Sequence, residues 1–209
     1  VTGNAVYLSG RSAVQYQVTS NASVPISGIG NTLYGSTAAA QALRSLITST
    51  PGTNLFEREH ARVVQRSIDA DVALRNALGG ITPLATVFPV TGLGNQLSMV
   101  ARMIAARNAV SAKRQVFFVG IGGFDTHDKL ADNHPALLTQ IGGALAAFDA
   151  AMVELGTSQQ VTAFTASDFG RTLSSNGDGS DHGWGSFHFI SGGAVRGQCA
   201  GDQGRVLHL

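Results

Sequence analysis

The stretch that decides the fold is QVFFVGI at residues 115–121, a short and continuously apolar run. Such a run is typical of a strand that is covered on both faces, and a second one, VTAFTA, occupies residues 161–166. Between them, apolar residues repeat at spacings of three and four, as in an amphipathic helix: Leu138, Ile141, Leu145, Phe148, Met152 and Leu155. The simplest interpretation is a strand–helix–strand unit, with two parallel strands joined by a right-handed crossover.

Upstream of this unit the sequence predicts three helices and, in residues 1–35, one or two short surface strands around Val14. The first helix spans residues 36–48. The second begins at Asn54, where Asn54 and Glu57 form a capping-box pattern, and ends at about Leu78. The third covers residues 94–108, with Leu97, Val100, Met103 and Ile104 on one stripe. We expect the segment that follows the central helix to end in a strand over residues 187–191.

The composition bounds the class of protein. The 209 residues are 44% hydrophobic and suffice for one domain with a real core. Charged residues make up 13%, against roughly 25% in an average domain, and the net charge is +1. That balance gives no indication of a nucleic-acid partner. No apolar run is long enough for a transmembrane helix. The single Cys199 excludes an intrachain disulfide and a thiolate zinc site.

Chemistry-bearing side chains follow both predicted strands and the glycine-rich loop at residues 174–185. Ligands of open parallel sheets bind beyond the carboxyl ends of the strands, so these side chains are expected to meet at one edge. The candidates are Asp125, His127, Asp168, Arg171, Asp181 and His182. Oxygen and nitrogen donors without sulfur suit zinc, manganese, iron, calcium or magnesium, and the guanidinium of Arg171 suits a phosphate or sulfate oxyanion.

Each candidate also has a structural interpretation. Aspartates in glycine-rich loops, such as Asp178 and Asp181, often only stabilise turns through bonds to the backbone. Arg171 is equally suited to a structural ion pair with a nearby carboxylate. We expect His134, just before Pro135 at the start of a helix, to be an exposed residue, and His188 to be structural.

Three motifs carry a resemblance to a known family. They are GGFDTHD (122–128), ASDFGRT (166–172) and GSDHGWGSFHFISGGAVRG (179–197). Together they resemble an uncharacterised bacterial family, domain of unknown function 1501, which is grouped with the alkaline phosphatase and sulfatase superfamily and whose members are commonly exported, often with a twin-arginine signal. The resemblance covers most of the chain.

The resemblance implies an alkaline-phosphatase-like α/β fold, a layered αβα arrangement with a largely parallel sheet. It also implies a divalent metal bound by Asp125, His127, Asp168 and His182, with Asp181 orienting a ligand histidine and Arg171 binding substrate. The chain departs from the superfamily pattern where Phe169, and not histidine, follows Asp168. This departure favours a one-metal or altered site.

The resemblance further implies a metal-dependent hydrolase of phosphate or sulfate esters, small or polymeric, located in the periplasm or outside the cell. The superfamily nucleophile comes from an N-terminal region, so no catalytic nucleophile is assigned, and residues 1–209 are expected to be one incomplete domain. The alternative is a non-catalytic exported module that keeps the fold for binding or assembly. A nucleotide-binding domain is disfavoured because Gly122-Gly123 matches neither phosphate-binding glycine motif.

Overall fold

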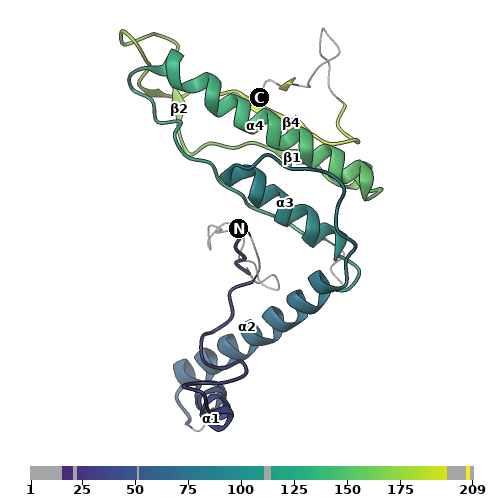
Figure 1. Cartoon of the computed structure of the whole chain (residues 1–209). Helices are drawn as coiled ribbons and strands as arrows, with labels where there is room; N and C mark the ends of the chain where they lie inside the picture. Colours follow the sequence, from purple (N-terminus) through teal and green to yellow (C-terminus); the bar gives the residue numbers. More distant parts are fainter. Residues whose placement is uncertain (1–15, 21–22, 51, 111–113, 197–205, 208–209) are drawn as a thin grey trace. The chain divides into compact units, whose positions relative to one another are not determined.

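The computed structural model describes residues 16–20, 23–50, 52–110, 114–196 and 206–207 (Figure 1). The chain divides into two compact units, one of residues 1–81 and 106–118 and the other of residues 82–105 and 119–209. The strand predicted around Val14 is only partly described, since Val14 itself lies outside the described residues. Cys199 also lies outside them. The expectation of one incomplete domain over the whole chain stays a prediction.

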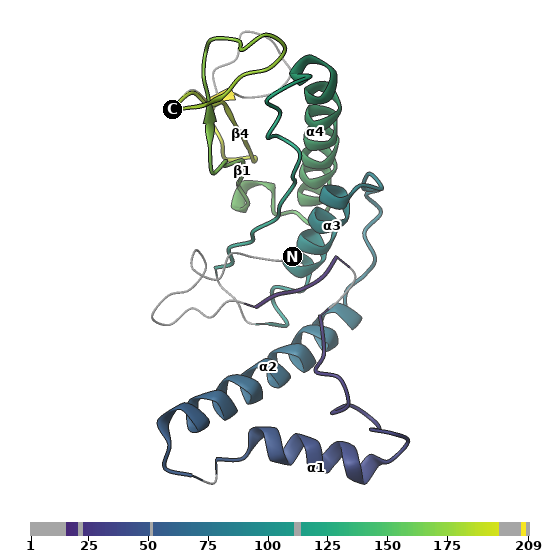
Figure 2. The same cartoon turned by 90° about the vertical axis from the view of Figure 1, so that its left-hand side faces the viewer.

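The first unit is built on two helices that contact each other, α1 (Thr37–Thr48) and α2 (Leu55–Gly79) (Figure 2). Both begin at a side-chain cap. The Ser36 hydroxyl accepts a hydrogen bond from the Ala39 amide at 3.2 Å, and the Asn54 side chain accepts one from the Phe56 amide at 2.9 Å. These caps satisfy amides that have no partner within the helix, and the predicted positions of both helices are confirmed.

A buried polar cluster fastens the N-terminal segment of the first unit to α2. The Asp71 side chain on α2 accepts hydrogen bonds from the Ser23 hydroxyl and the Arg75 guanidinium, and both Asp71 and Ser23 are buried. Burial raises the pKa of Tyr16, and the charge of Asp71 adds to that rise. Polar groups out of water need such partners, so this cluster fixes how Ser23 lies against the helix.

In the second unit the core lies between α3 (Gly92–Ala105) and α4 (Leu130–Glu154), which run side by side (Figures 1 and 2). The predicted apolar stripes supply much of it, because residues three and four apart share a helix face. Its buried members are Leu97, Met99, Val100, Ala101, Ile104, Ala144, Phe148, Ala151 and Met152.

Helix α4 begins earlier than Pro135, where the sequence predicted its start. The Leu130 amide donates to the Asp178 carbonyl oxygen at 3.0 Å, and Lys129 before it is left-handed, with φ of 48°. Pro135 therefore lies inside the helix. By length and composition alone α4 is long and apolar enough to cross a membrane, as core helices of soluble proteins can also be.

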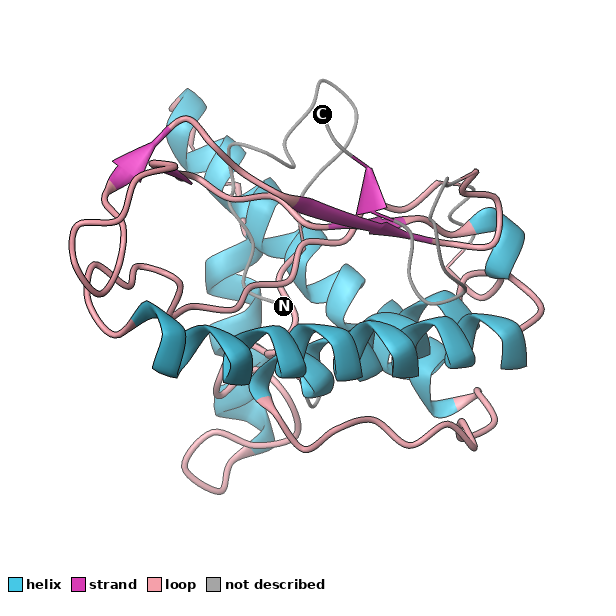
Figure 3. Cartoon of the chain, turned by 90° about the horizontal axis from the view of Figure 1, so that it is seen from above, coloured by secondary structure: helices cyan, strands magenta, loops and turns pink. Residues whose placement is uncertain are grey.

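The strands are short and antiparallel. One sheet has the order β1–β4–β5, from Ala163–Phe164, His188–Ser191 and Val206–Leu207, and it lies along α4 (Figure 3). A second pairs β2 (Gly170–Arg171) with β3 (His182–Gly183). A short 3₁₀ helix, η1 (Ser158–Gln160), precedes β1.

The Ser191 hydroxyl on β4 donates to the Asp149 carboxylate on α4, which ties the first sheet to the helix. The predicted last strand, residues 187–191, is confirmed as β4. Residues 115–121 form no ladder with the rest of the described chain, so the largely parallel, layered sheet stays a prediction.

Candidate functional site

Three short segments of the second unit bring the predicted site residues together. Asp125 and His127 lie on the loop before α4, Arg171 lies on β2, and Asp181 and His182 lie at the start of β3. The antiparallel register pairs Arg171 with His182, and the Thr172 amide donates to the Asp181 carbonyl oxygen at 2.9 Å. The β2–β3 pairing therefore carries three of the predicted residues to one place.

The centre of the site is one carboxylate oxygen with two imidazoles. Asp125 Oδ1 lies 2.7 Å from His182 Nε2 and 3.0 Å from His127 Nε2. These three side chains offer donor atoms that all lie within 4.8 Å of one another. Their side chains are 58%, 50% and 50% exposed, for Asp125, His127 and His182 respectively, so the cluster opens to solvent.

The donor set fits a divalent cation in its chemistry. Two imidazole nitrogens and a carboxylate oxygen are the ligands of many zinc and transition-metal sites. Zinc bonds of about 2.0–2.1 Å separate tetrahedral ligand atoms by roughly 3.3 Å. The Asp125 oxygen lies at hydrogen-bond distance from the two imidazoles, 2.7 and 3.0 Å, so each nitrogen would have to move away from it by roughly 0.3–0.6 Å to share such an ion.

Asp181 holds the second nitrogen of His127. Asp181 Oδ1 lies 3.2 Å from His127 Nδ1 and accepts a hydrogen bond from Asn176 Nδ2 at 3.0 Å. Asn176 Nδ2 also donates to the His127 carbonyl oxygen at 2.9 Å. A carboxylate on the far nitrogen of a histidine fixes its tautomer and frees the near nitrogen for a metal. This is the arrangement that the sequence predicted for Asp181.

The electrostatics keep both carboxylates ionised. The hydrogen bond from His182 lowers the pKa of Asp125, and the charges of His182 and His127 act in the same direction. Hydrogen bonds from His127 and then Asn176 lower the pKa of Asp181. An oxygen that binds a cation must be unprotonated, so at neutral pH both groups are in the form that a metal requires.

Arg171 is bound to the protein on several sides. Its guanidinium donates to the Phe124 carbonyl oxygen at 2.7 Å, to the Ser180 carbonyl oxygen, and to Asp125 Oδ1 at 3.3 Å. Its side chain is only 20% exposed. These contacts join the loop before α4 to the loop before β3, so the geometry supports the structural interpretation of Arg171 more than a role in binding an oxyanion.

Asp168 is the predicted ligand that the structure does not bring into the cluster. It is exposed, and it is absent from the donor group found among the described residues. The next residue, Phe169, does reach the site: its ring stacks on the His182 ring at 4.5 Å between centroids and 12° between planes. The sequence identified Phe169 only as a departure from a metal-binding pattern.

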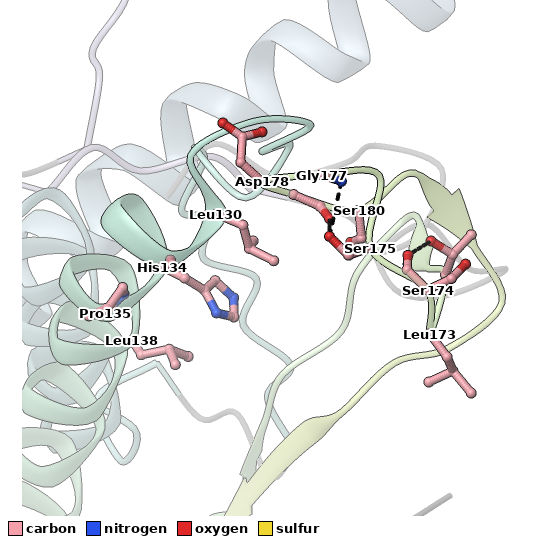
Figure 4. Close-up of a pocket in the computed structure, with 13 residues that line it drawn as sticks. Leu130, His134, Pro135, Leu138, Leu173, Ser174, Ser175, Gly177, Asp178 and Ser180 are labelled. Carbon is pink, nitrogen blue, oxygen red and sulfur yellow. Dashed lines mark hydrogen bonds between the residues drawn. The ribbon is translucent and has the colours of Figure 1, made fainter.

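Apart from this cluster, a hollow of about 600 Å³ lies between the first turns of α4 and residues 172–180 (Figure 4). Leu130, His134 and Leu138 line it from the helix, opposite Ser174 and other hydroxyl-bearing residues of the loop. Asp125, His127 and His182 do not line this hollow. His134 is half-buried and packs edge-on against Phe124 at 5.6 Å. The sequence analysis did not predict that His134 lines a hollow. The i, i+4, i+8 spacing of Leu130, His134 and Leu138 could have indicated it, because residues at that spacing share one helix face.

Comparison with known proteins gives one result. No curated protein and no solved structure matches the chain. Residues 36–206 match a family described as "Protein of unknown function (DUF1501)". That match covers parts of both compact units and every residue of the Asp125–His127–His182 cluster. The chain therefore belongs to the DUF1501 family.

Proposed function

We propose that this protein binds one divalent metal ion through Asp125, His127 and His182 and uses it to hydrolyse phosphate or sulfate esters. The observation that carries the proposal is the convergence of three donor atoms within 4.8 Å from two segments far apart in the sequence, the loop before α4 and strand β3. Zinc, manganese, iron, calcium or magnesium are the candidates, and two imidazoles favour the transition metals and zinc among them.

Within the part of the chain that the structure describes, three converging ligand groups favour catalysis over a purely structural ion. Structural zinc sites are closed by four protein ligands, whereas catalytic sites keep a position for water or substrate. Here three side chains converge and remain about half exposed. A bound metal would lower the pKa of a water ligand and polarise the ester oxygen. The residues themselves would hold the ion, and Asp181 would keep His127 in the correct tautomer.

The superfamily resemblance supports the ester substrate class, small or polymeric, and location in the periplasm or outside the cell. The alternative is a non-catalytic exported module with a bound ion. The hydrogen bonds of Arg171 to Phe124, Ser180 and Asp125 favour this alternative. They use the guanidinium group that the sequence analysis assigned to binding a substrate oxyanion.

Metal content measured by mass spectrometry, on protein purified without chelator, tests the site. We expect near-stoichiometric metal in the wild type and its loss in His182→Ala. His60→Ala is the matched control, since His60 is an exposed histidine on α2. A folded wild-type protein that takes up no metal would overturn the proposal.

A panel of chromogenic phosphate and sulfate esters then separates the two functions. Turnover that disappears both with chelator and in His182→Ala supports the hydrolase. Stoichiometric metal without turnover on any ester of the panel supports the binding module.

A further inference from the structure

Four side chains form a continuous stack beside the metal cluster. The Arg171 guanidinium carbon lies 5.1 Å from the centre of the Phe169 ring. Phe169 stacks on His182, and His182 stacks on His127 at 4.9 Å with 29° between the planes. His182 is thus held between two rings, while its Nε2 edge points to Asp125 Oδ1 at 2.7 Å.

The two histidines are positioned by different means. Asp181 holds His127 through Nδ1. Among the residues that the structure describes, no protein group is placed to hydrogen-bond Nδ1 of His182. A metal-binding histidine ordinarily donates its far N–H to a carboxylate, a carbonyl or water, which fixes the plane of the ring. The near-parallel ring of Phe169 supplies that constraint here.

The plane of an imidazole decides where its lone pair points, since the lone pair lies in the plane of the ring. His182 is half exposed and would otherwise sample several orientations of its broad terminal torsion. Stacking on Phe169 restricts the ring to planes that aim Nε2 at the Asp125 oxygen. The stack begins at Arg171, whose guanidinium is itself held by the Phe124 and Ser180 carbonyl oxygens and contributes a cation–π contact.

We propose that Phe169 is the positioning residue of His182 and sets the affinity of the site for its metal. This inference rests on the proposed metal site. It gives a role to an aromatic side chain that contacts the cluster without offering a ligand atom.

Titration with Co²⁺, followed by its visible absorption, tests the inference on the whole chain. We expect Phe169→Leu, which removes the ring but keeps an apolar side chain, to weaken Co²⁺ binding by about 10–100-fold, as loss of an outer partner of a ligand does. Phe169→Tyr, which keeps the aromatic face, should bind Co²⁺ with wild-type affinity and give the wild-type spectrum. Phe164→Leu, at an exposed phenylalanine on β1, is the matched control and should change neither.

A ring-current shift of the His182 carbon-bound protons in nuclear magnetic resonance spectra provides a readout without metal, and it should be lost in Phe169→Leu and kept in Phe169→Tyr. Wild-type Co²⁺ affinity in Phe169→Leu, together with loss of binding in His182→Ala, would overturn this inference alone. Absence of Co²⁺ uptake by the folded wild type would overturn the proposed site, and the inference with it.

Discussion

Gly179 lies directly against the backbone of His127: a Cβ atom at position 179 would come within 2.3 Å of the His127 carbonyl oxygen. The same carbonyl accepts a hydrogen bond from Asn176. The glycine-rich loop can therefore approach the loop that carries Asp125 and His127 only because position 179 has no side chain. This contact sets the distance between His127 and the Asp181–His182 segment that completes the cluster.

Gly179→Ala should destabilise the protein and weaken metal binding together. The added methyl group meets backbone, which cannot move aside cheaply, and overpacking of this kind costs about 1–3 kcal/mol. Urea denaturation and metal titration would measure the two effects. Gly142→Ala, in the interior of α4 with nothing within 4 Å of its Cβ position, is the control and should stabilise the protein by about 0.5–1 kcal/mol. Equal stability in Gly179→Ala and the wild type would contradict this contact.

Arg171→Lys should lower stability. The planar guanidinium bonds to the Phe124 and Ser180 carbonyl oxygens at once, and a lysine ammonium on a longer flexible stem does not match that geometry. Loss of one hydrogen bond to a charged group costs about 1.5–3 kcal/mol. Chemical denaturation gives the stability. If Arg171 held a substrate oxyanion instead, this variant would raise KM for an ester and leave the unfolding curve unchanged.

The sequence predicted the helices well because their signals are local. Side-chain caps at Ser36 and Asn54 and the apolar stripe of α3 depend on residues a few positions apart. It placed the start of α4 too late, because Leu130 is bonded to Asp178, a residue distant in the sequence that no local pattern indicates.

The candidate site likewise has a part that the sequence could predict and a part that it could not. Asp125, His127, Asp181 and His182 could be named from donor chemistry and glycine-rich context, and the structure brings them together. The stacking of Phe169 on His182 could not be predicted, because it depends on the orientation of both rings. A phenylalanine just after a predicted strand is ordinarily interpreted as a packing residue. The engagement of Arg171 with two carbonyls depends equally on loop geometry.

Asp125 and Asp168 provide a test of which predicted aspartate binds the metal. Both were predicted as ligands, and only Asp125 lies in the donor cluster of the described chain. We expect Asp125→Asn to lose the metal, because an amide is a weaker ligand and removes the negative charge, and Asp168→Asn to retain it. Metal content of the two variants, purified side by side, decides the matter. Loss of metal in Asp168→Asn would make Asp168 a ligand and would require a rearranged loop.

Asp71→Ala should destabilise the first unit. Removing the carboxylate leaves the buried Ser23 hydroxyl without its acceptor, and an unsatisfied buried donor costs about 1–3 kcal/mol. Amide hydrogen exchange should rise in residues 16–20 and 23 and in the middle of α2. Asp69→Ala, at an exposed residue two positions along the same helix, is the control and should leave exchange in the N-terminal segment unchanged. Unchanged protection in Asp71→Ala would show that residues 16–20 and 23 are held by other contacts.

Glu154 at the end of α4 should make the stability of the second unit depend on pH. Its carboxylate accepts hydrogen bonds from the Ala85 amide at 2.7 Å, the Thr86 amide at 2.9 Å and the Thr86 hydroxyl at 2.6 Å. The Thr86 hydroxyl is the largest cause of a lowered Glu154 pKa, followed by the two amides. A carboxyl group whose pKa falls on folding stabilises the native state above its unfolded pKa, and that contribution is lost as the pH falls through the folded pKa.

Glu154→Gln isolates this contribution, because glutamine has the same shape but offers one acceptor oxygen in place of two and carries no charge. At pH 7 we expect a lower free energy of unfolding in the variant than in the wild type. The difference should shrink below the ordinary glutamate pKa and vanish once the wild-type carboxyl is protonated. Urea denaturation in steps from pH 7 to acid measures this, with Asp128→Asn, at an exposed loop acid, expected to follow the wild-type curve. A gap between wild type and Glu154→Gln that stays constant at all pH values would mean that the three bonds do not depend on ionisation, and that Glu154 holds residues 85–86 by shape alone.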